Sequence, residues 1–422
     1  MFFFFKVLFL NMLFLEFIKC VIKFNFKKKF SLNEVGKTIN YIDYIYKNDL
    51  YTELLIGNPS QIIPMTIKYD QEPFYLATPF SNGIFNHNIS NTFYSNFSEI
   101  NYPNDERKKG YISSEKIVLN SQNNKIEISN IFFFYLTQPK TPIIDIASLG
   151  LSFMKKSIYN NLNFLIQLKQ KNLIDNYGYS YYFINENEGN VFIGNYPHEY
   201  NHSFYDFFDF FHLHIASSFD YTGIFDKIFY GDNLMNAVGT FYINNTLGGI
   251  IGNYFIEKLI EYDFFLQYME NKKCEKKLND GFLYYECDHD INISNFKNLS
   301  FYSQEINFTF VLTYEDLFHK INEKIYSKII YRRTMLPIFI LGQPFLKKYF
   351  FVFDQNKKIM GFYKKFKQKK YFISLSFLLM IILLFFSIIL IIILIRKIMK
   401  NPKRVKANEL EENNEYLMQI DF

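Results

Sequence analysis

The stretch Leu50 to Phe80, LYTELLIGNPSQIIPMTIKYDQEPFYLATPF, decides the fold. It contains two apolar, strand-like runs, LLIG and IIPMTIKYD, and the turn residues Asn58-Pro59-Ser60 stand between them. Asn and Pro in such a position favour a tight reversal of the chain between two strands. The sequence therefore predicts a β-hairpin whose second strand ends in the carboxylate of Asp70.

This hairpin resembles the first catalytic hairpin of the pepsin-like aspartic peptidases. In that family, two strands joined by an I-G-x-P-x-Q turn deliver an Asp-Thr-Gly-Ser loop, and an apolar L-W-x-P segment follows. The matching residues here are Ile56, Gly57, Pro59, Gln61, Asp70, Leu76 and Pro79. The resemblance implies that Asp70 is the first catalytic aspartate.

The loop after Asp70 departs from the family pattern. Gln71, Glu72 and Pro73 stand where the family has Thr, Gly and Ser. Glu72 adds a second negative charge, and the ring of Pro73 removes a backbone donor.

Composition sets the broad class of the molecule. The 422 residues suffice for two lobes of ordinary domain size plus extra segments. The formal net charge of +5 is modest, and the basic residues are scattered along the chain, so nucleic acid is not an expected partner.

The region from Tyr41 to about Asn195 contains many short apolar runs separated by Asn, Gly, Pro and Ser, which is typical of an all-β domain. Its landmarks follow the order of the pepsin-like family. Tyr102 is at the position of the flap tyrosine, and Gly110 is expected to start the next strand. NFLIQLKQKNLI resembles a helix, and YSYYFINENEGNVFIGN resembles the hairpin that closes the first lobe.

The second half ends on the most specific match. FILGQPFLKKYFFVFDQNKKIMGF, residues 339–362, resembles the family ending, which consists of a buried strand, a short helix and a final hairpin. Gly342 is expected to allow close packing behind the second catalytic loop. The resemblance implies an all-β, bilobal fold with a central cleft, with an N-terminal β lobe at 41-197 and a C-terminal β lobe at 198-365.

The second catalytic loop of the family is a strand followed by Asp-Thr-Gly-Thr/Ser, and the candidate here is GTFYINNTLGGIIGNYF. Aligning Phe241-Tyr242-Ile243 with the strand puts Asn244 at the aspartate. Shifting the register by one, to align Ile250-Ile251, puts Asn245 there instead. Neither register supplies an acid, because no Asp or Glu occurs between Asp232 and Glu257.

The sequence has three cysteines, of which Cys20 falls in an apolar N-terminal segment. KKCEKKLNDGFLYYECD, around Cys274 and Cys287, resembles the disulfide loop in the second lobe of the family. The resemblance implies a Cys274–Cys287 disulfide, which an oxidising compartment would favour. A pair of free buried cysteines is the alternative.

Two apolar segments predict targeting and topology. Residues 1-20 read as a signal peptide, with a retained signal anchor as the alternative. Residues 371-395 are uncharged; as a helix they would span about 37 Å, enough for a bilayer core of about 30 Å. Basic residues follow, so the tail 396-422 is expected on the cytoplasmic side. The prediction is a single-pass type I membrane protein of the secretory or endolysosomal system or the cell surface.

The missing second acid decides the functional hypotheses. Aspartic proteolysis needs two carboxylates that share one proton, and an Asn amide cannot exchange roles as acid and base. The first hypothesis is a peptidase homologue with impaired catalysis that keeps a peptide-binding cleft. The second is an active endopeptidase that uses Asp70 with another acid such as Glu72, and the third is a structural or recognition ectodomain. A peptide or protein and the lipid bilayer are the expected partners; no cofactor and no metal are implied.

Overall fold

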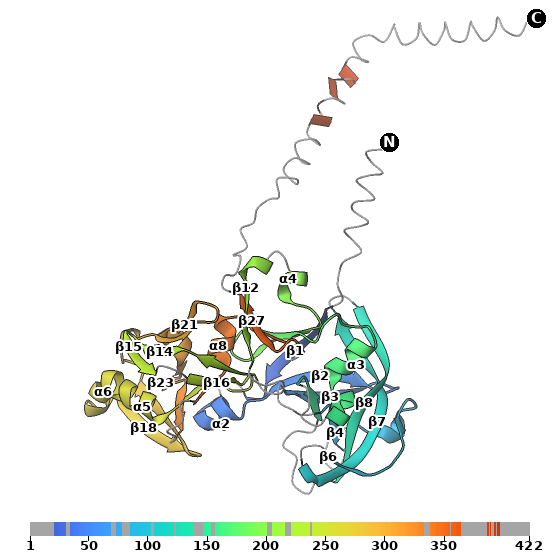
Figure 1. The fold of residues 1–422 in the computed structure, drawn as a ribbon, viewed down its shortest axis with the longest axis horizontal. Coiled ribbons are helices and arrows are strands. Elements are labelled where there is room, and N and C mark those ends of the chain that lie inside the picture. The colour runs from blue at the N-terminus through green and yellow to red at the C-terminus, as the bar shows by residue number, and fades with distance from the viewer. Residues whose placement is uncertain are drawn as a thin grey trace, which may run out of the picture. The chain divides into compact units, whose positions relative to one another are not determined.

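The computed structural model describes residues 21–30, 34–68, 73–77, 85–102, 105–121, 124–138, 147–152, 157–200, 205–215, 221–236, 239–332, 338–354 and 356–363, with isolated residues between 386 and 396. The chain divides into two units, Met1–Phe366 and Lys367–Phe422. The first unit is mostly β-structure with a few short helices (Figure 1). This agrees with the all-β class expected from the sequence.

The largest sheet of the described residues has 14 strands, in the order β12-β27-β26-β10-β11-β1-β2-β3-β9-β4-β8-β7-β5, with β6 paired to β7. Its strands are β1 (Ile22–Lys28), β2 (Leu50–Ile56), β3 (Gln61–Lys68), β4 (Tyr75–Ala77), β5 (Tyr94–Ser95), β6 (Ile100–Tyr102), β7 (Asp105–Ser121), β8 (Asn124–Gln138), β9 (Ala147–Gly150), β10 (Tyr179–Phe183), β11 (Glu188–Ile193), β12 (Phe210–His214), β26 (Val352–Asp354) and β27 (Ile359–Tyr363). Strands from both ends of the unit therefore share one sheet.

Two smaller sheets belong to the second half of the unit. The nine-stranded sheet contains β13 (Thr222–Phe225), β16 (Gly239–Ile243), β17 (Ile250–Gly252), β18 (Cys274–Asn279), β19 (Phe282–Asp288), β22 (Phe318–Ile321), β23 (Lys324–Ser327), β24 (Ile329–Arg332) and β25 (Ile338–Leu341). The four-stranded sheet contains β14 (Lys227–Tyr230), β15 (Asn233–Asn236), β20 (Leu299–Ser303) and β21 (Phe308–Leu312).

The helices are short and lie between strands. They are α2 (Tyr41–Tyr46), α3 (Phe164–Gln170), α4 (Pro197–Tyr200), α5 (Tyr254–Ile260), α6 (Leu266–Glu270), α7 (Tyr314–Leu317) and α8 (Gln343–Lys348). A π-helical turn, Glu261–Phe265, joins α5 to α6.

The predicted first hairpin is confirmed. Strands β2 and β3 pair antiparallel from Tyr51 with Thr66 to Ile56 with Gln61, and the Asn58-Pro59-Ser60 turn connects them. Alternate side chains of β2 are buried, as expected for a strand with one face on the core. Strand β3 ends at Lys68, and the described chain resumes at Pro73. Asp70 therefore lies outside the described residues.

The two halves repeat one four-strand arrangement. In the first half, β9 lies between a parallel neighbour, β3, and an antiparallel neighbour, β4, which pairs in parallel with β8. In the second half, β25 lies between β16 and β17 in the same way, and β17 pairs in parallel with β24. The β3–β4 connection, which contains Asp70, is thus topologically equivalent to the β16–β17 connection, which contains Asn244.

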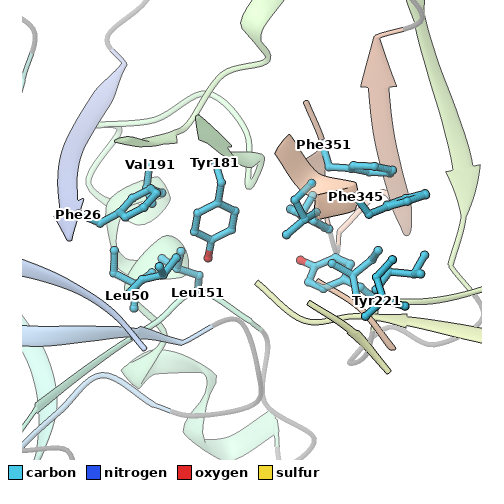
Figure 2. Packing of buried hydrophobic residues seen from close by; sticks show 14 of the residues in the cluster. Phe26, Leu50, Leu151, Tyr181, Val191, Tyr221, Phe345 and Phe351 are labelled. Carbon is cyan, nitrogen blue, oxygen red and sulfur yellow. The ribbon is translucent and has the colours of Figure 1, made fainter. Parts of the chain in front are cut away.

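The halves are joined by strand pairing and by an apolar core. Strand β10 pairs with β26, and the rings of Tyr179 and Phe353 stack with centroids 5.4 Å apart across that pair. One cluster of buried apolar side chains includes Phe26, Tyr181 and Val191 as well as Tyr221, Phe345 and Phe351. Figure 2 shows these residues arriving from strands and a helix of both halves.

Strand β1 precedes the predicted start of the N-terminal lobe at Tyr41. It pairs with β11 along Ile22 to Lys27 and with β2 at Lys27 and Lys28, so it lies inside the largest sheet. The predicted signal peptide, residues 1-20, lies outside the described residues and stays a prediction.

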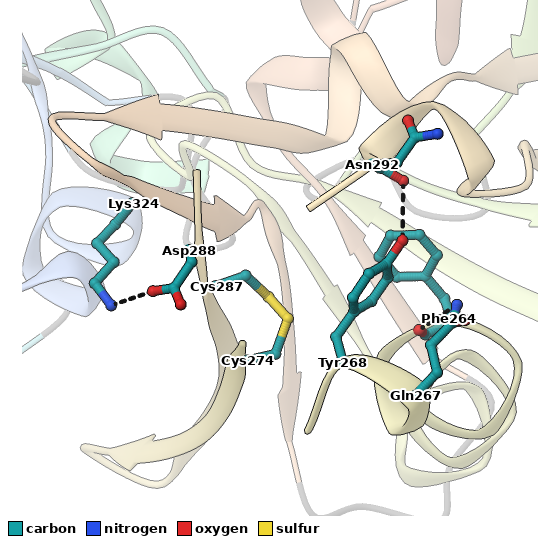
Figure 3. The surroundings of a disulfide bond; sticks show 8 residues. All are labelled: Phe264, Gln267, Tyr268, Cys274, Cys287, Asp288, Asn292 and Lys324. Carbon is teal, nitrogen blue, oxygen red and sulfur yellow. Dashed lines mark hydrogen bonds and ion pairs between the residues drawn. A yellow bond between two sulfur atoms is a disulfide. The ribbon is translucent and has the colours of Figure 1, made fainter. Parts of the chain in front are cut away.

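The expected disulfide is present. Cys274 and Cys287 face each other across the antiparallel strands β18 and β19, and their sulfur atoms are bonded (Figure 3). Next to the bridge, Asp288 pairs with Lys324 at 2.8 Å. The bridge therefore closes the β18–β19 hairpin at its open end.

The second unit is described at only a few positions. Residues 386–387, 389, 392–393 and 395–396 are helical, and the side chains of Phe386, Ile389 and Ile392 are exposed. Among the described residues, no helix is both long enough and apolar enough to cross a membrane. Most of the predicted span 371-395, and the tail 396-422 except Arg396, lie outside the described residues.

Candidate active site

The β16–β17 connection begins with Asn244. Strand β16 ends at Ile243, which pairs with Leu341 of β25, and the backbone N–H of Asn244 donates to the Leu341 carbonyl at 2.9 Å. The Asn244 side chain therefore projects from a backbone that is fixed to the central strand of the four-strand arrangement. Asn244 is the residue that the first of the two predicted registers puts at the second aspartate.

The side-chain oxygen of Asn244 organises the loop. Oδ1 accepts from the Thr246 N–H at 2.9 Å, the Thr246 hydroxyl at 2.8 Å and the Leu247 N–H at 3.1 Å. Three donors converge on one acceptor, so the oxygen faces the loop backbone and the Nδ2 group points away from these donors. A carboxylate in the same place could accept the same bonds.

Asn245 occupies a different environment. Its side chain is 1% exposed, and neither Oδ1 nor Nδ2 has a hydrogen-bond partner in the part of the chain that the structure describes. A buried amide without partners costs free energy on the order of 1–3 kcal/mol. The structure thus distinguishes the two asparagines: the side chain of Asn244 accepts the hydrogen bonds of the loop, and that of Asn245 is buried without a partner among the described residues.

The start of α8 supports the loop from behind. The Gln343 N–H donates to the Leu247 carbonyl at 2.8 Å, and the Gln343 side-chain amide donates to the Asn245 carbonyl at 3.2 Å. A Cβ atom on Gly342 would lie 2.2 Å from the Leu247 oxygen and 2.3 Å from the Gly249 oxygen. No larger residue fits there, which confirms the predicted role of Gly342.

Helix α2 covers another part of the loop. The carbonyl of Ile45 accepts from the Gly248 N–H at 2.7 Å. Ile42 and Ile45 pack in a buried cluster with Leu247, Ile251 and Ile330. The loop backbone is therefore held on one side by α8 and on another by a helix from the N-terminal segment.

Tyr102, the predicted flap tyrosine, ends β6 and is 3% exposed. Its ring makes edge contacts with Tyr75 and Phe134, with centroid distances of 5.7 and 5.3 Å. Gly110 lies inside β7, which begins at Asp105, so the expectation that Gly110 starts the strand is wrong. Its Cβ would lie 2.1 Å from the Tyr135 carbonyl, so close pairing with β8 explains the glycine.

The first acidic residue after Asn244 in the sequence already forms an ion pair with a lysine. Glu257 on α5 is fully buried and forms an ion pair with Lys276 of β18. The structure does not describe Gln71 or Glu72, so it neither places Glu72 nor tests it as a second acid.

A surface cavity of about 420 Å³ lies away from these residues. Strands β1, β2, β3 and β7 line it, with Lys23, Lys27, Tyr51 and Glu53 among its residues. None of the predicted site residues belongs to its lining.

Sequence reasoning did not identify the residues that hold the loop. Thr246 had a detectable signal, because Asn-x-Thr spacing favours a turn in which the side chain of Asn accepts from the second residue after it. Gln343 and Ile45 gave no such signal, since their contacts with the loop cross long sequence separations.

Comparison with family models identifies the fold family. The model for eukaryotic aspartyl proteases matches residues 77–365, which is more than half of the chain. The chain belongs to the eukaryotic aspartyl protease family. The match includes Tyr102, the Asn244 loop and the disulfide, and it begins after Asp70. A comparison with curated proteins finds no match.

Membership of the aspartyl protease family indicates which chemistry the β16–β17 connection should be compared with. Peptides or proteins are the substrates of the family, and its chemistry depends on two carboxylates. In this aspartyl protease homologue, the β16–β17 connection begins with the amide of Asn244, and no Asp or Glu lies between the two strands. The catalytic roles of Asp70 and Asn244 remain predictions.

Proposed function

We propose that this aspartyl protease homologue binds peptides in a family-type cleft between two lobes and has lost efficient hydrolysis. The observation that carries the proposal is Asn244, whose Oδ1 accepts three hydrogen bonds from Thr246 and Leu247. The scaffold around the loop is intact, while its side chain cannot ionise.

The chemistry explains the impairment. One carboxylate must draw a proton from water while a protonated partner polarises the scissile carbonyl. With Asn244 opposite, Asp70 would have no acidic partner to share a proton with. Tyr102, the predicted flap tyrosine, is 3% exposed and packs against Tyr75 and Phe134, so the proposed peptide contacts do not rest on its ring.

The test is acid-pH cleavage of a mixed peptide library by the full chain purified in detergent, with and without pepstatin. We expect no pepstatin-sensitive turnover, together with saturable binding of peptides or of pepstatin. Pepstatin-sensitive turnover that disappears in Asp70→Asn would overturn the impairment. Absence of both turnover and binding would support a purely structural or recognition ectodomain.

A matched variant distinguishes the effect of the missing second acid from the effect of the altered loop after Asp70. Asn244→Asp restores a carboxylate that can accept the same three hydrogen bonds. Turnover gained by Asn244→Asp, and lost again in the double variant with Asp70→Asn, would place the defect at Asn244. If the wild-type chain is active, loss of that activity in Glu72→Gln would favour the alternative in which Glu72 is the second acid.

The membrane anchor is part of the same proposal. Residues 371-395 are uncharged and apolar, and the positions described there are helical with exposed Phe386, Ile389 and Ile392. We expect the full chain to resist extraction from membranes by alkaline carbonate and a chain that ends at Phe366 to be released. Extraction of the full chain by carbonate would contradict the anchor.

A further inference from the structure

Positive side chains gather around the turn between β10 and β11. Glu186 lies in that turn, and its carboxylate is 2.8 Å from Lys347 Nζ, 3.7 Å from Lys328 Nζ and 3.5 Å from His319 Nε2. Lys347 belongs to α8, Lys328 lies between β23 and β24, and His319 is on β22. Segments far apart in the sequence thus bring their charges to a single carboxylate.

Lys28 on β1 adds a further ammonium group beside this turn, where its backbone N–H donates to the carbonyl of Asn187 at 2.7 Å. It is 9% exposed, and its Nζ has no hydrogen-bond partner in the described part of the chain. The nearest compensation is the ring of Tyr44, whose centroid is 5.2 Å from Nζ. A buried ammonium group without a hydrogen-bonded anion is costly, and this one also faces the charges of Lys328 and Lys347.

The other titratable groups near Lys28 do not balance the charge. Burial, followed by Lys328, lowers the pKa of His319 to about 3, so the ring is neutral at ordinary pH. Burial raises the pKa of Tyr41 and of Tyr44, so both phenols are neutral as well. Asp316, whose charge also acts on Lys328, forms an ion pair with Lys348 at 2.5 Å.

We propose that Lys28, Glu186, Lys328 and Lys347, the Lys28 cluster, form a binding site for a small tetrahedral oxyanion such as sulfate or inorganic phosphate. Three lysines face one carboxylate, so a dianion would neutralise the cluster. Lysine suits such a ligand because its ammonium group is a compact point charge with three donors.

The burial of the cluster limits the size of the ligand. The side chain of Lys328 is 7% exposed and that of Lys347 is 22% exposed, whereas that of Glu186 is 39% exposed. Glu186 is thus the most exposed member of the cluster, and we expect the ligand to approach from its side. The burial of the lysines favours a small free oxyanion over a phosphate group carried on a macromolecule.

Binding should be linked to protonation of Lys28. Burial, and after it the charge of Lys347, lowers the pKa of Lys28 to about 7. Lys328 also lowers this pKa, whereas Glu186 raises it. Sulfate remains a dianion across this range, so its affinity should rise as the pH falls from 8 to 6. The expected change is at least threefold.

The experiment is calorimetric titration of sulfate into the full chain at constant ionic strength, with chloride as the replaced anion. At pH 6, Lys28→Met should weaken sulfate binding at least tenfold, and it should abolish the pH dependence. Lys27→Met is the matched control, because Lys27 is the adjacent, exposed residue of the same strand; it should change the affinity less than twofold. Inorganic phosphate should compete with sulfate.

Glu186→Gln should change the sulfate affinity in the opposite direction. Removing the carboxylate that competes for Lys347 should tighten sulfate binding severalfold. If Lys28→Met does not fold, as judged by circular dichroism, Lys347→Met replaces it, with the same tenfold weakening expected. The proposal is overturned by the absence of saturable sulfate binding, by unchanged affinity in the lysine variants, or by weaker binding in Glu186→Gln.

Discussion

Asn244 is a residue whose role in the structure can be separated from its role in catalysis. Replacement by Ala would leave the buried donors of Thr246 and Leu247 without their acceptor, at a cost of about 1–3 kcal/mol of unfolding free energy. Asn244→Asp should retain most of the wild-type stability, because a carboxylate accepts the same bonds. Urea unfolding of the three proteins measures both effects, and equal losses in Ala and Asp variants would contradict this account.

The lowered pKa of Lys28 predicts that the stability of the fold depends on pH. This pKa is about 7 in the folded chain, against an ordinary lysine value of 10.5. Between these values the unfolded chain binds more protons, so stability should rise with pH by at most about 1.4 kcal/mol per unit. The penalty is fully present below pH 7. Urea unfolding at pH 7, 8 and 9 should show a smaller slope for Lys28→Met than for Lys27→Met; identical slopes would exclude the buried charge.

The burial of Lys28 was only partly visible in the sequence. Lys27-Lys28-Lys29 reads as a solvated basic run. The alternation of Phe24, Phe26 and Lys28 nevertheless places Lys28 on the apolar face of a strand, and that face is buried in β1. The lysines that meet it, Lys328 and Lys347, come from distant segments, so no local pattern could indicate the cluster.

At the scale of elements, ion pairs between side chains connect α5 and the π-helical turn to β18. Lys276 pairs with Glu257 and, at 2.5 Å, with Glu261, which also accepts from the Tyr285 hydroxyl at 2.8 Å. Lys276→Met would leave the fully buried Glu257 without its cation, and we expect a loss of about 3–5 kcal/mol.

Lys277→Met is the control for this element. Lys277 is 37% exposed at its side chain and pairs with Glu286, so its removal should cost less than about 1 kcal/mol. Thermal or urea unfolding compares the two variants. Equal stability of Lys276→Met and Lys277→Met would show that the buried pair contributes no more than a surface pair.

Turn chemistry predicted elements well where it acts locally. The Asn58-Pro59-Ser60 turn gave the β2–β3 hairpin, and α8 begins directly after Gly342 as expected. Gly110 was misplaced because a glycine inside a strand and a glycine before one give the same local signal, and only pairing with β8 distinguishes them. Local signals of this kind could not predict the contacts of the Asn244 loop with Ile45 and Gln343, because these residues are far from the loop in the sequence.

For the whole molecule, β1 is predicted to be essential. A chain beginning at Lys29 would lose the strand between β11 and β2 and the buried side chains of Phe24 and Phe26. We expect this chain to show no cooperative thermal unfolding, whereas one beginning at Val21 should unfold cooperatively. Similar melting curves for both would show that β1 is dispensable.

The family ending and the first hairpin made the overall fold predictable, because each motif combines a turn with buried strands. The equivalence of β3-β9-β4 and β16-β25-β17 became visible only in the strand pairing, since the connections between these strands differ in sequence. The role of Asp70 stays a prediction, and so does that of Asn244, although the structure shows how Asn244 is held.

The sheet that joins the two halves also sets the order in which the chain can fold during synthesis. Strands β1, β2 and β11 are all made by Ile193, so their pairing can form early. Strand β12 pairs with β27, which leaves the ribosome roughly 150 residues later, a delay of about 7–30 s at 5–20 residues per second. During that interval, the edge of β10 that later binds β26 is also unpaired. The nascent chain should therefore depend most on chaperones after its first half is complete.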